Sequence, residues 1–190
     1  MATIDELSTI VAQLVEANEN LQQSVKKLLR QRKLDFRIPQ LATGFDIEDV
    51  IFPPTVRVTN GAQIISNNIT TTFTFDTETW DTDGMHSTAS NTSRLTVKTT
   101  GKYRYSAHIR WDAHGTGVRA IRILLNNATV INQIVTNDTP NDAVDMQITG
   151  TYELSIGSYI ELQGFQNSGG NLATETASGG SEFSMEWISS

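Results

Sequence analysis

The segment Trp80-Asp81-Thr82-Asp83-Gly84 holds the residues best suited to contact a ligand. Two aspartates one residue apart and followed by glycine match part of the spacing of a calcium loop, where alternate carboxylates converge on one cation. The other ligands of a complete loop are absent in register, so we favour a turn over a cation site. Trp80 is expected in a loop, where its indole ring can stack on a sugar. We therefore predict that Trp80, Asp81 and Asp83 contact a ligand.

Catalytic motifs are missing from the sequence. The three histidines are scattered without H-E-x-x-H spacing, and no G-x-S-x-G elbow is present. The chain has no cysteine and therefore no thiolate ligand. A second acidic loop, at residues 138–145, reads as a solvated connection. We predict a protein that is not an enzyme, with no catalytic residue, metal or cofactor.

Charge is divided unevenly along the 190 residues. Residues 1–40 hold six Lys/Arg and five Asp/Glu, whereas residues 41–190 hold eight and sixteen. An acidic domain lacks the cations that neutralise phosphates, so nucleic acid is not an expected partner. No secretory leader and no long apolar run are visible, which predicts synthesis in the cytoplasm without membrane insertion.

The chain begins with a heptad repeat of apolar residues, which predicts an α-helix with one apolar seam. Its a positions are Ile4, Val11, Asn18 and Val25, and its d positions are Leu7, Leu14, Leu21 and Leu28. One chain cannot bury such a seam, so these eight residues are predicted to drive self-association. Asn18 is expected to set the register of the helices.

The number of helices is left open by the residues alone. Branched residues at a with leucine at d favour a dimer. The flanking positions are also apolar, with Ile10 and Ala17 at g and Val15 and Leu29 at e. A wider apolar face suits three or more helices, because each helix then touches two neighbours.

The sequence divides into three regions. Residues 1–32 form the predicted stalk, and residues 33–54 form a linker in which three prolines prevent a continuous helix. This linker is apolar enough to pack against the rest of the chain or to dock on a larger assembly. Residues 55–190 form the predicted head.

The head is predicted to be all β, with about ten short strands in a sandwich or jelly roll. Alternation is clearest at Gly101–Trp111, and turn signals such as Asn126-Asn127 recur between the apolar runs. The candidate strands are 55–58, 62–65, 70–75, 93–96, 101–111, 119–125, 129–137, 145–154, 159–167 and 182–188.

Several segments of the head occur in an order that resembles C1q-like heads of bacterial and phage proteins. An F-D strand at Phe75-Asp76 is followed by Trp80-Asp81, by N-x-S-R-L at residues 91–95, and by G-x-Y at residues 101–103. A late G-S-x-I-x-L strand at residues 157–162 and a closing strand at residues 182–188 are also similar. The resemblance covers about residues 70–190.

This resemblance implies a ten-strand C1q-like jelly roll that assembles as a homotrimer, which favours three helices in the stalk. A stalk, linker and head of this size look like a bacteriophage virion protein. The implied function is a non-enzymatic capsid head fibre or decoration protein that displays an adhesive C1q-like head on the particle surface, with other virion proteins as partners. The alternative is a short tail fibre that recognises a host surface glycan.

Overall fold

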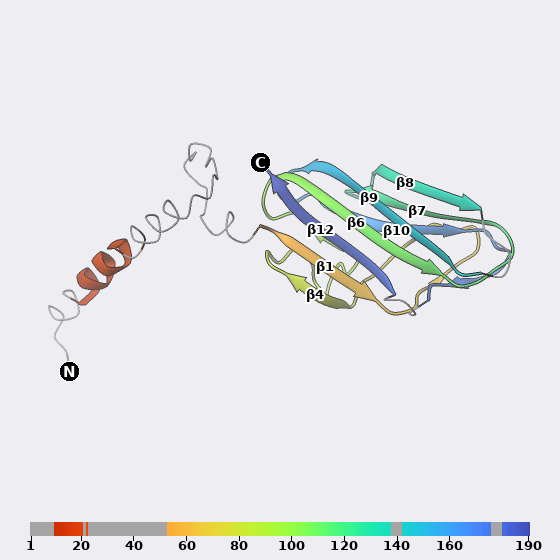
Figure 1. Cartoon of the computed structure of the whole chain (residues 1–190), viewed down its shortest axis with the longest axis horizontal. Coiled ribbons are helices and arrows are strands. Elements are labelled where there is room, and N and C mark those ends of the chain that lie inside the picture. Colours follow the sequence, from red (N-terminus) through yellow and green to blue (C-terminus); the bar gives the residue numbers. More distant parts are fainter. Residues whose placement is uncertain (1–9, 21, 23–52, 138–141, 176–179) are drawn as a thin grey trace. The chain divides into compact units, whose positions relative to one another are not determined.

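The computed structural model describes residues 10–20, 22, 53–137, 142–175 and 180–190 (Figure 1). The chain divides into two units, Met1–Phe45 and Asp46–Ser190, which we describe separately. In the first unit, residues 10–20 and residue 22 are helical. The second unit is the β head.

The first sheet of the head has five antiparallel strands. They lie in the order β4 (Thr77–Asp81), β1 (Thr55–Asn60), β12 (Ser181–Ser189), β6 (Gly101–Trp111) and β9 (Val144–Leu154). The strand β12 therefore lies at the centre of the sheet and joins β1 to β6 (Figure 1).

The second sheet also has five strands. Its path runs β3 (Thr71–Thr72), β10 (Tyr159–Gln166), β7 (Val118–Leu125) and β8 (Thr129–Asn137), and β5 (Arg94–Thr96) also pairs with β10. A further pair is formed by β2 (Ile64–Ile65) and β11 (Leu172–Ala173). The turn between β7 and β8 places Asn126 and Asn127 at φ values of 50° and 54°, as the Asn-Asn signal predicts.

The core lies between the two sheets and follows from the period of two along each strand. On β6 the odd-numbered residues are buried and the even-numbered ones are more exposed, which confirms the predicted alternation. The strands β7 and β10 bury Ile121, Ile123, Ile160 and Leu162 in the same cluster. The result is a sandwich, as the sequence predicts.

The predicted number of strands was wrong, because the described residues form twelve strands rather than ten. The strand β4 was missed because four of its five residues are exposed, so it has no apolar alternation to reveal it. The two-residue strand β11 is too short to produce a pattern. Conversely, the candidate strand at 70–75 shrinks to β3, although Phe73 and Phe75 beyond it are fully buried.

The end of the predicted linker belongs to the head. The described residues of the segment 33–54 are Pro53 and Pro54, and Pro54 is buried. The Pro54 carbonyl accepts a hydrogen bond from the Trp187 amide at 2.8 Å, and the Pro53 carbonyl accepts one from the Thr82 hydroxyl at 3.2 Å. Residues 33–52 lie outside the described part of the chain.

Candidate functional site

Asp81 ends β4 and organises the turn that follows it. One of its carboxylate oxygens accepts hydrogen bonds from the amides of Asp83 at 3.2 Å and Met85 at 3.0 Å. The other accepts one from the amide of His86 at 2.8 Å. A carboxylate that satisfies three backbone donors holds its own loop together. This geometry is the turn that the sequence favours over a cation site.

Asp83 lies in the same turn and is half-buried. Its carboxylate accepts a hydrogen bond from the Thr99 hydroxyl at 3.5 Å. Gly84 follows at φ 62°, a left-handed conformation that glycine adopts without steric cost. Within the described residues, no group of three or more His, Asp or Glu is arranged to hold a metal ion.

Trp80 lies on the strand β4 and not in a loop, and it is 42% exposed. Its indole nitrogen donates to the Thr55 hydroxyl at 3.3 Å. The Arg57 guanidinium lies 5.4 Å from the ring centroid and also pairs with Glu182. Arg57 thus lies over the indole, and a sugar would have to approach by the ring surface that Arg57 leaves uncovered.

The histidines lie in separate environments. The ring of His86 is buried, with Nδ1 2.8 Å from a Glu78 carboxylate oxygen and Nε2 3.1 Å from the Thr92 carbonyl. Both nitrogens therefore face acceptors, one on the strand β4 and one in the loop that precedes β5. His114 contacts the Thr116 hydroxyl at 3.4 Å. These contacts are structural ones within the head.

His108 belongs to a charged group on the outward face of the first sheet. Its Nε2 lies 3.0 Å from the Asp145 carboxylate, which also pairs with Arg110. Arg110 in turn donates to Glu175 at 2.6 Å. The hydrogen bond to Glu175 raises the pKa of the Arg110 guanidinium, and the negative charge of Asp145 adds to the rise.

The described part of the helix carries three of the eight predicted seam residues: Val11, Leu14 and Asn18. Val11 is 59% exposed and Leu14 is 64% exposed, and both flanking residues Ile10 and Val15 are also exposed. The remaining seam positions, Ile4, Leu7, Leu21, Val25 and Leu28, lie outside the described residues. No helix of the described part is long and apolar enough to span a membrane.

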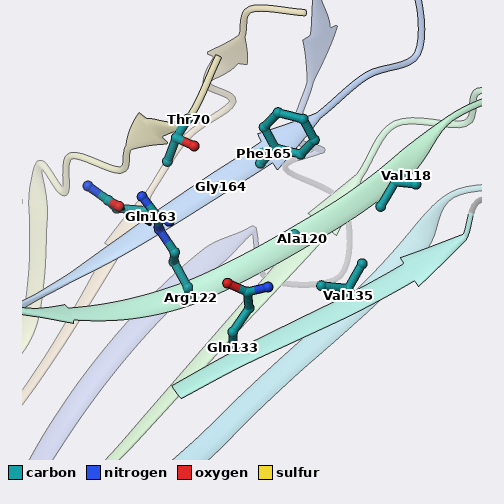
Figure 2. Close-up of a pocket in the computed structure, with 9 residues that line it drawn as sticks. All are labelled: Thr70, Val118, Ala120, Arg122, Gln133, Val135, Gln163, Gly164 and Phe165. Carbon is teal, nitrogen blue, oxygen red and sulfur yellow. Dashed lines mark hydrogen bonds between the residues drawn. The ribbon is translucent and has the colours of Figure 1, made fainter. Parts of the chain in front are cut away.

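A hollow of about 320 Å³ lies on the outward face of the second sheet (Figure 2). We call it the Arg122 hollow and define it by two rows of residues across β10, β7 and β8. One row is Gln163, Arg122 and Gln133, and the other is Phe165, Ala120 and Val135. Thr70, Val118 and Gly164 complete its lining.

The Arg122 hollow was not predicted from the sequence. Val118, Ala120 and Arg122 share the face of β7 opposite the buried Ile121 and Ile123, but nothing in the sequence shows that β10 and β8 flank this strand. The hollow arises because a small residue, Ala120, is paired with larger residues on both sides. Only the register of three strands reveals this arrangement.

Comparison with known proteins relates the head to solved structures. No protein-family model matches the chain, and no curated protein matches it. Murine APRIL at pH 5.0 aligns with a TM-score of 0.54 and 11% identity, covering 71% of this chain and 98% of that chain. Eiger TNF from S. frugiperda aligns with a TM-score of 0.53 and 14% identity, covering 72% and 92%.

The head has a TNF-like jelly-roll fold. The globular domain of zebrafish complement 1qA protein also aligns, with a TM-score of 0.49 and 15% identity, covering 71% of this chain and 97% of that chain. At these identities the similarity concerns the fold of the head and not its ligands. The jelly roll expected from the sequence is therefore confirmed.

Proposed function

We propose that this chain is a non-enzymatic homotrimeric structural protein of a bacteriophage virion, most simply a capsid head fibre or decoration protein. The observation that carries the proposal is the exposed apolar face of the helix. Val11 and Leu14 are 59% and 64% exposed in the single chain, and Ile10 and Val15 extend the same surface. Copies of the helix would bury these side chains against one another.

Two features support three copies rather than two. The apolar residues at Ile10 and Val15 flank the seam on both sides, which allows each helix to contact two neighbours. The jelly-roll head agrees with the C1q-like resemblance, and that resemblance implies a trimer. Three linked heads would multiply weak surface contacts through effective concentration.

A structural role accords with how the polar residues of the head are used. Asp81 closes a turn, His86 bridges a carboxylate and a carbonyl, and His108 pairs with Asp145. Each of these side chains makes a contact within the fold, as expected for a protein with a structural role. Release of reducing sugar from a host polysaccharide by the purified protein would overturn the non-enzymatic assignment.

Light scattering on the purified full chain tests the assembly. We expect a mass of about three times the 20.9 kDa of one chain. A mass of two chains would show that the a and d residues decide the number of helices and that the proposed trimer is wrong.

Attachment to the tail is the second candidate. It is favoured by the Arg122 hollow, since a recessed polar site on the head suits recognition of a receptor. Immunogold labelling of phage particles with an antibody to the head separates the two candidates. Gold on the capsid shell supports the head fibre or decoration protein, whereas gold at the tail tip supports a receptor-binding tail fibre.

A further inference from the structure

The Arg122 hollow has a polar end and an apolar end because of the register of its three strands. Arg122 is paired with Gln163 of β10 and with Gln133 of β8, which makes the polar row. Ala120 is paired with Phe165 and with Val135, which makes the apolar row. Figure 2 shows these side chains on the same face of β10, β7 and β8. The floor at Ala120 is low because its side chain is a single methyl group.

Arg122 is held in one orientation at the polar end. Its Nε donates to the Gln163 side-chain oxygen at 2.8 Å. The Gln163 amide nitrogen donates to the Thr72 hydroxyl at 3.0 Å, so both ends of this amide are engaged. Gln163 is 8% exposed and cannot swing freely. The two Nη groups of Arg122 are then the guanidinium donors left for a ligand.

The charge of Arg122 is not balanced by a carboxylate of the described residues. Four other arginines of the head, Arg57, Arg94, Arg104 and Arg110, each pair with Glu or Asp within 4.0 Å. No residue that lines the hollow is acidic, although the protein as a whole carries a net charge of −7. An unbalanced, oriented cation in an acidic protein favours an anionic ligand.

We propose that the Arg122 hollow binds one carboxylated sugar residue of an acidic polysaccharide. A guanidinium matches a carboxylate in a planar, bidentate geometry. The Gln133 amide and the Thr70 hydroxyl make no hydrogen bond to another described residue, and they can bond to sugar hydroxyls. Phe165 and Val135 offer an apolar wall for the C–H face of the ring.

The size of the hollow supports a small ligand group. Its volume of about 320 Å³ falls at the lower end of the range of about 300–1,000 Å³ that is usual for small-molecule sites. A single sugar ring fits this volume, whereas a folded partner needs a wider contact. The inference supplies a ligand for the weak surface contacts of the three linked heads and rests on that part of the proposed function for its biological meaning.

The test is calorimetric titration of the full chain with a galacturonate trisaccharide and with the same trisaccharide after reduction of its carboxyl groups. The two probes differ in charge and share their ring hydroxyls. We expect the acidic probe to bind at least about tenfold more tightly than the reduced one, because a charge-assisted bidentate pair is lost on reduction. An absence of heat from the acidic probe at millimolar concentration would overturn the inference.

Two variants locate the binding. Arg122→Gln keeps a polar side chain but removes the charge, and it should bring both probes to the same weak affinity. Ala120→Leu leaves Arg122 in place but fills the floor of the hollow, and it should abolish binding of both probes. If either variant binds the acidic probe as tightly as the wild type does, the proposed site is wrong. Circular dichroism and the melting temperature establish that each variant is folded before it is titrated.

Arg104→Gln is the matched control. Arg104 lies on the strand β6 of the other sheet, and its side chain is 62% exposed. Its removal changes the net charge by the same amount and should leave both affinities unchanged. If Arg104→Gln weakens the acidic probe as much as Arg122→Gln does, the attraction is general and the site is wrong.

An acidic tripeptide of aspartate supplies the remaining comparison. Equal affinity for this peptide and for the galacturonate probe would show that the hollow takes any carboxylate, and the sugar assignment would then fail. None of these titrations depends on where the protein is attached to a particle. Light scattering and immunogold labelling therefore judge the proposed function independently of this inference.

Discussion

The rings of Phe73 and Trp111 meet edge to face, with centroids 6.4 Å apart and planes inclined at 70°. Phe73 follows the short strand β3, and Trp111 ends the long strand β6 of the other sheet. Both side chains are fully buried. This pair therefore ties the two sheets of the sandwich together, and its surroundings tolerate little added volume.

Gly164 lies beneath this aromatic pair and has no room for a side chain. A Cβ at this position would lie 2.7 Å from a Phe73 ring carbon and 3.1 Å from Trp111. We predict that Gly164→Ala lowers the free energy of unfolding by about 1–3 kcal/mol, the usual cost of overpacking a core. Urea denaturation followed by circular dichroism measures this change.

Gly61→Ala is the control for that substitution. A Cβ at Gly61 would meet no atom within 4 Å. We expect its unfolding free energy to stay within about 0.5 kcal/mol of the wild type. Equal losses at both positions would mean that backbone effects of glycine replacement, and not the aromatic pair, dominate.

Asp81 is predicted to stabilise the head through its turn. Asp81→Ala leaves the amides of Asp83, Met85 and His86 without their acceptor. We expect a loss of about 2–3 kcal/mol in the free energy of unfolding, because bonds to a charged acceptor are stronger than neutral ones. Asp76→Ala serves as the control, since Asp76 is exposed and bonds to the adjacent Thr77 hydroxyl.

Calcium provides a separate check on the same turn. If backbone amides alone close this turn, the melting temperature of the protein should be the same with and without millimolar calcium. A rise in melting temperature that disappears in Asp81→Ala would instead support a cation site at Asp81 and Asp83.

Leu14→Asp should weaken self-association. Leu14 occupies a d position and is 64% exposed in the single chain, so in an assembly it would lie in the seam. A buried, unpaired carboxylate opposes the packing of the helices. Light scattering over a range of protein concentrations should show dissociation at concentrations where the wild type stays assembled.

Gln13→Asp adds the same charge one residue away, at an outward c position of the heptad. It should leave the mass unchanged. If neither substitution alters the mass, the head alone holds the chains together and the helix is dispensable for assembly.

Trp80 and Arg57 are predicted to be energetically coupled. Their cation–π contact is exposed to solvent, so we expect a coupling free energy of about 0.5–1 kcal/mol. A double-mutant cycle with Trp80→Ala, Arg57→Ala and both together measures this term through chemical denaturation. Strictly additive effects would show that the ring and the guanidinium are neighbours without a net attraction.

Two long strands were predictable from the sequence, although only β6 alternates between buried and exposed residues. Gly101–Trp111 and Thr129–Asn137 were predicted with the boundaries that the structure has. The alternation on β6 has a physical origin, since one face of that strand is buried against the other sheet. The strand β4 is both short and exposed, so it lacks this signal, and it pairs with β1, which is distant in the sequence.

The candidate site was harder to predict for a related reason. The spacing of Asp81, Asp83 and Gly84 indicated a turn, and the structure has that turn. Trp80 was expected in a loop but pairs with Arg57 of β1 in the first sheet. The Arg122 hollow depends on the register of β10, β7 and β8, which single-residue patterns do not encode.

The central position of β12 sets an order on the folding of the head. The strands β6 and β9 are joined directly, whereas β1 reaches the rest of its sheet only through β12. Since Val58 pairs with Phe183, more than a hundred residues must be synthesised between these partners before they can meet. Such distant pairing slows folding, often into the range of about milliseconds to seconds. Until then the edge of β1 that pairs with β12 keeps its backbone groups unpaired, and an unpaired edge favours misassembly with neighbouring chains.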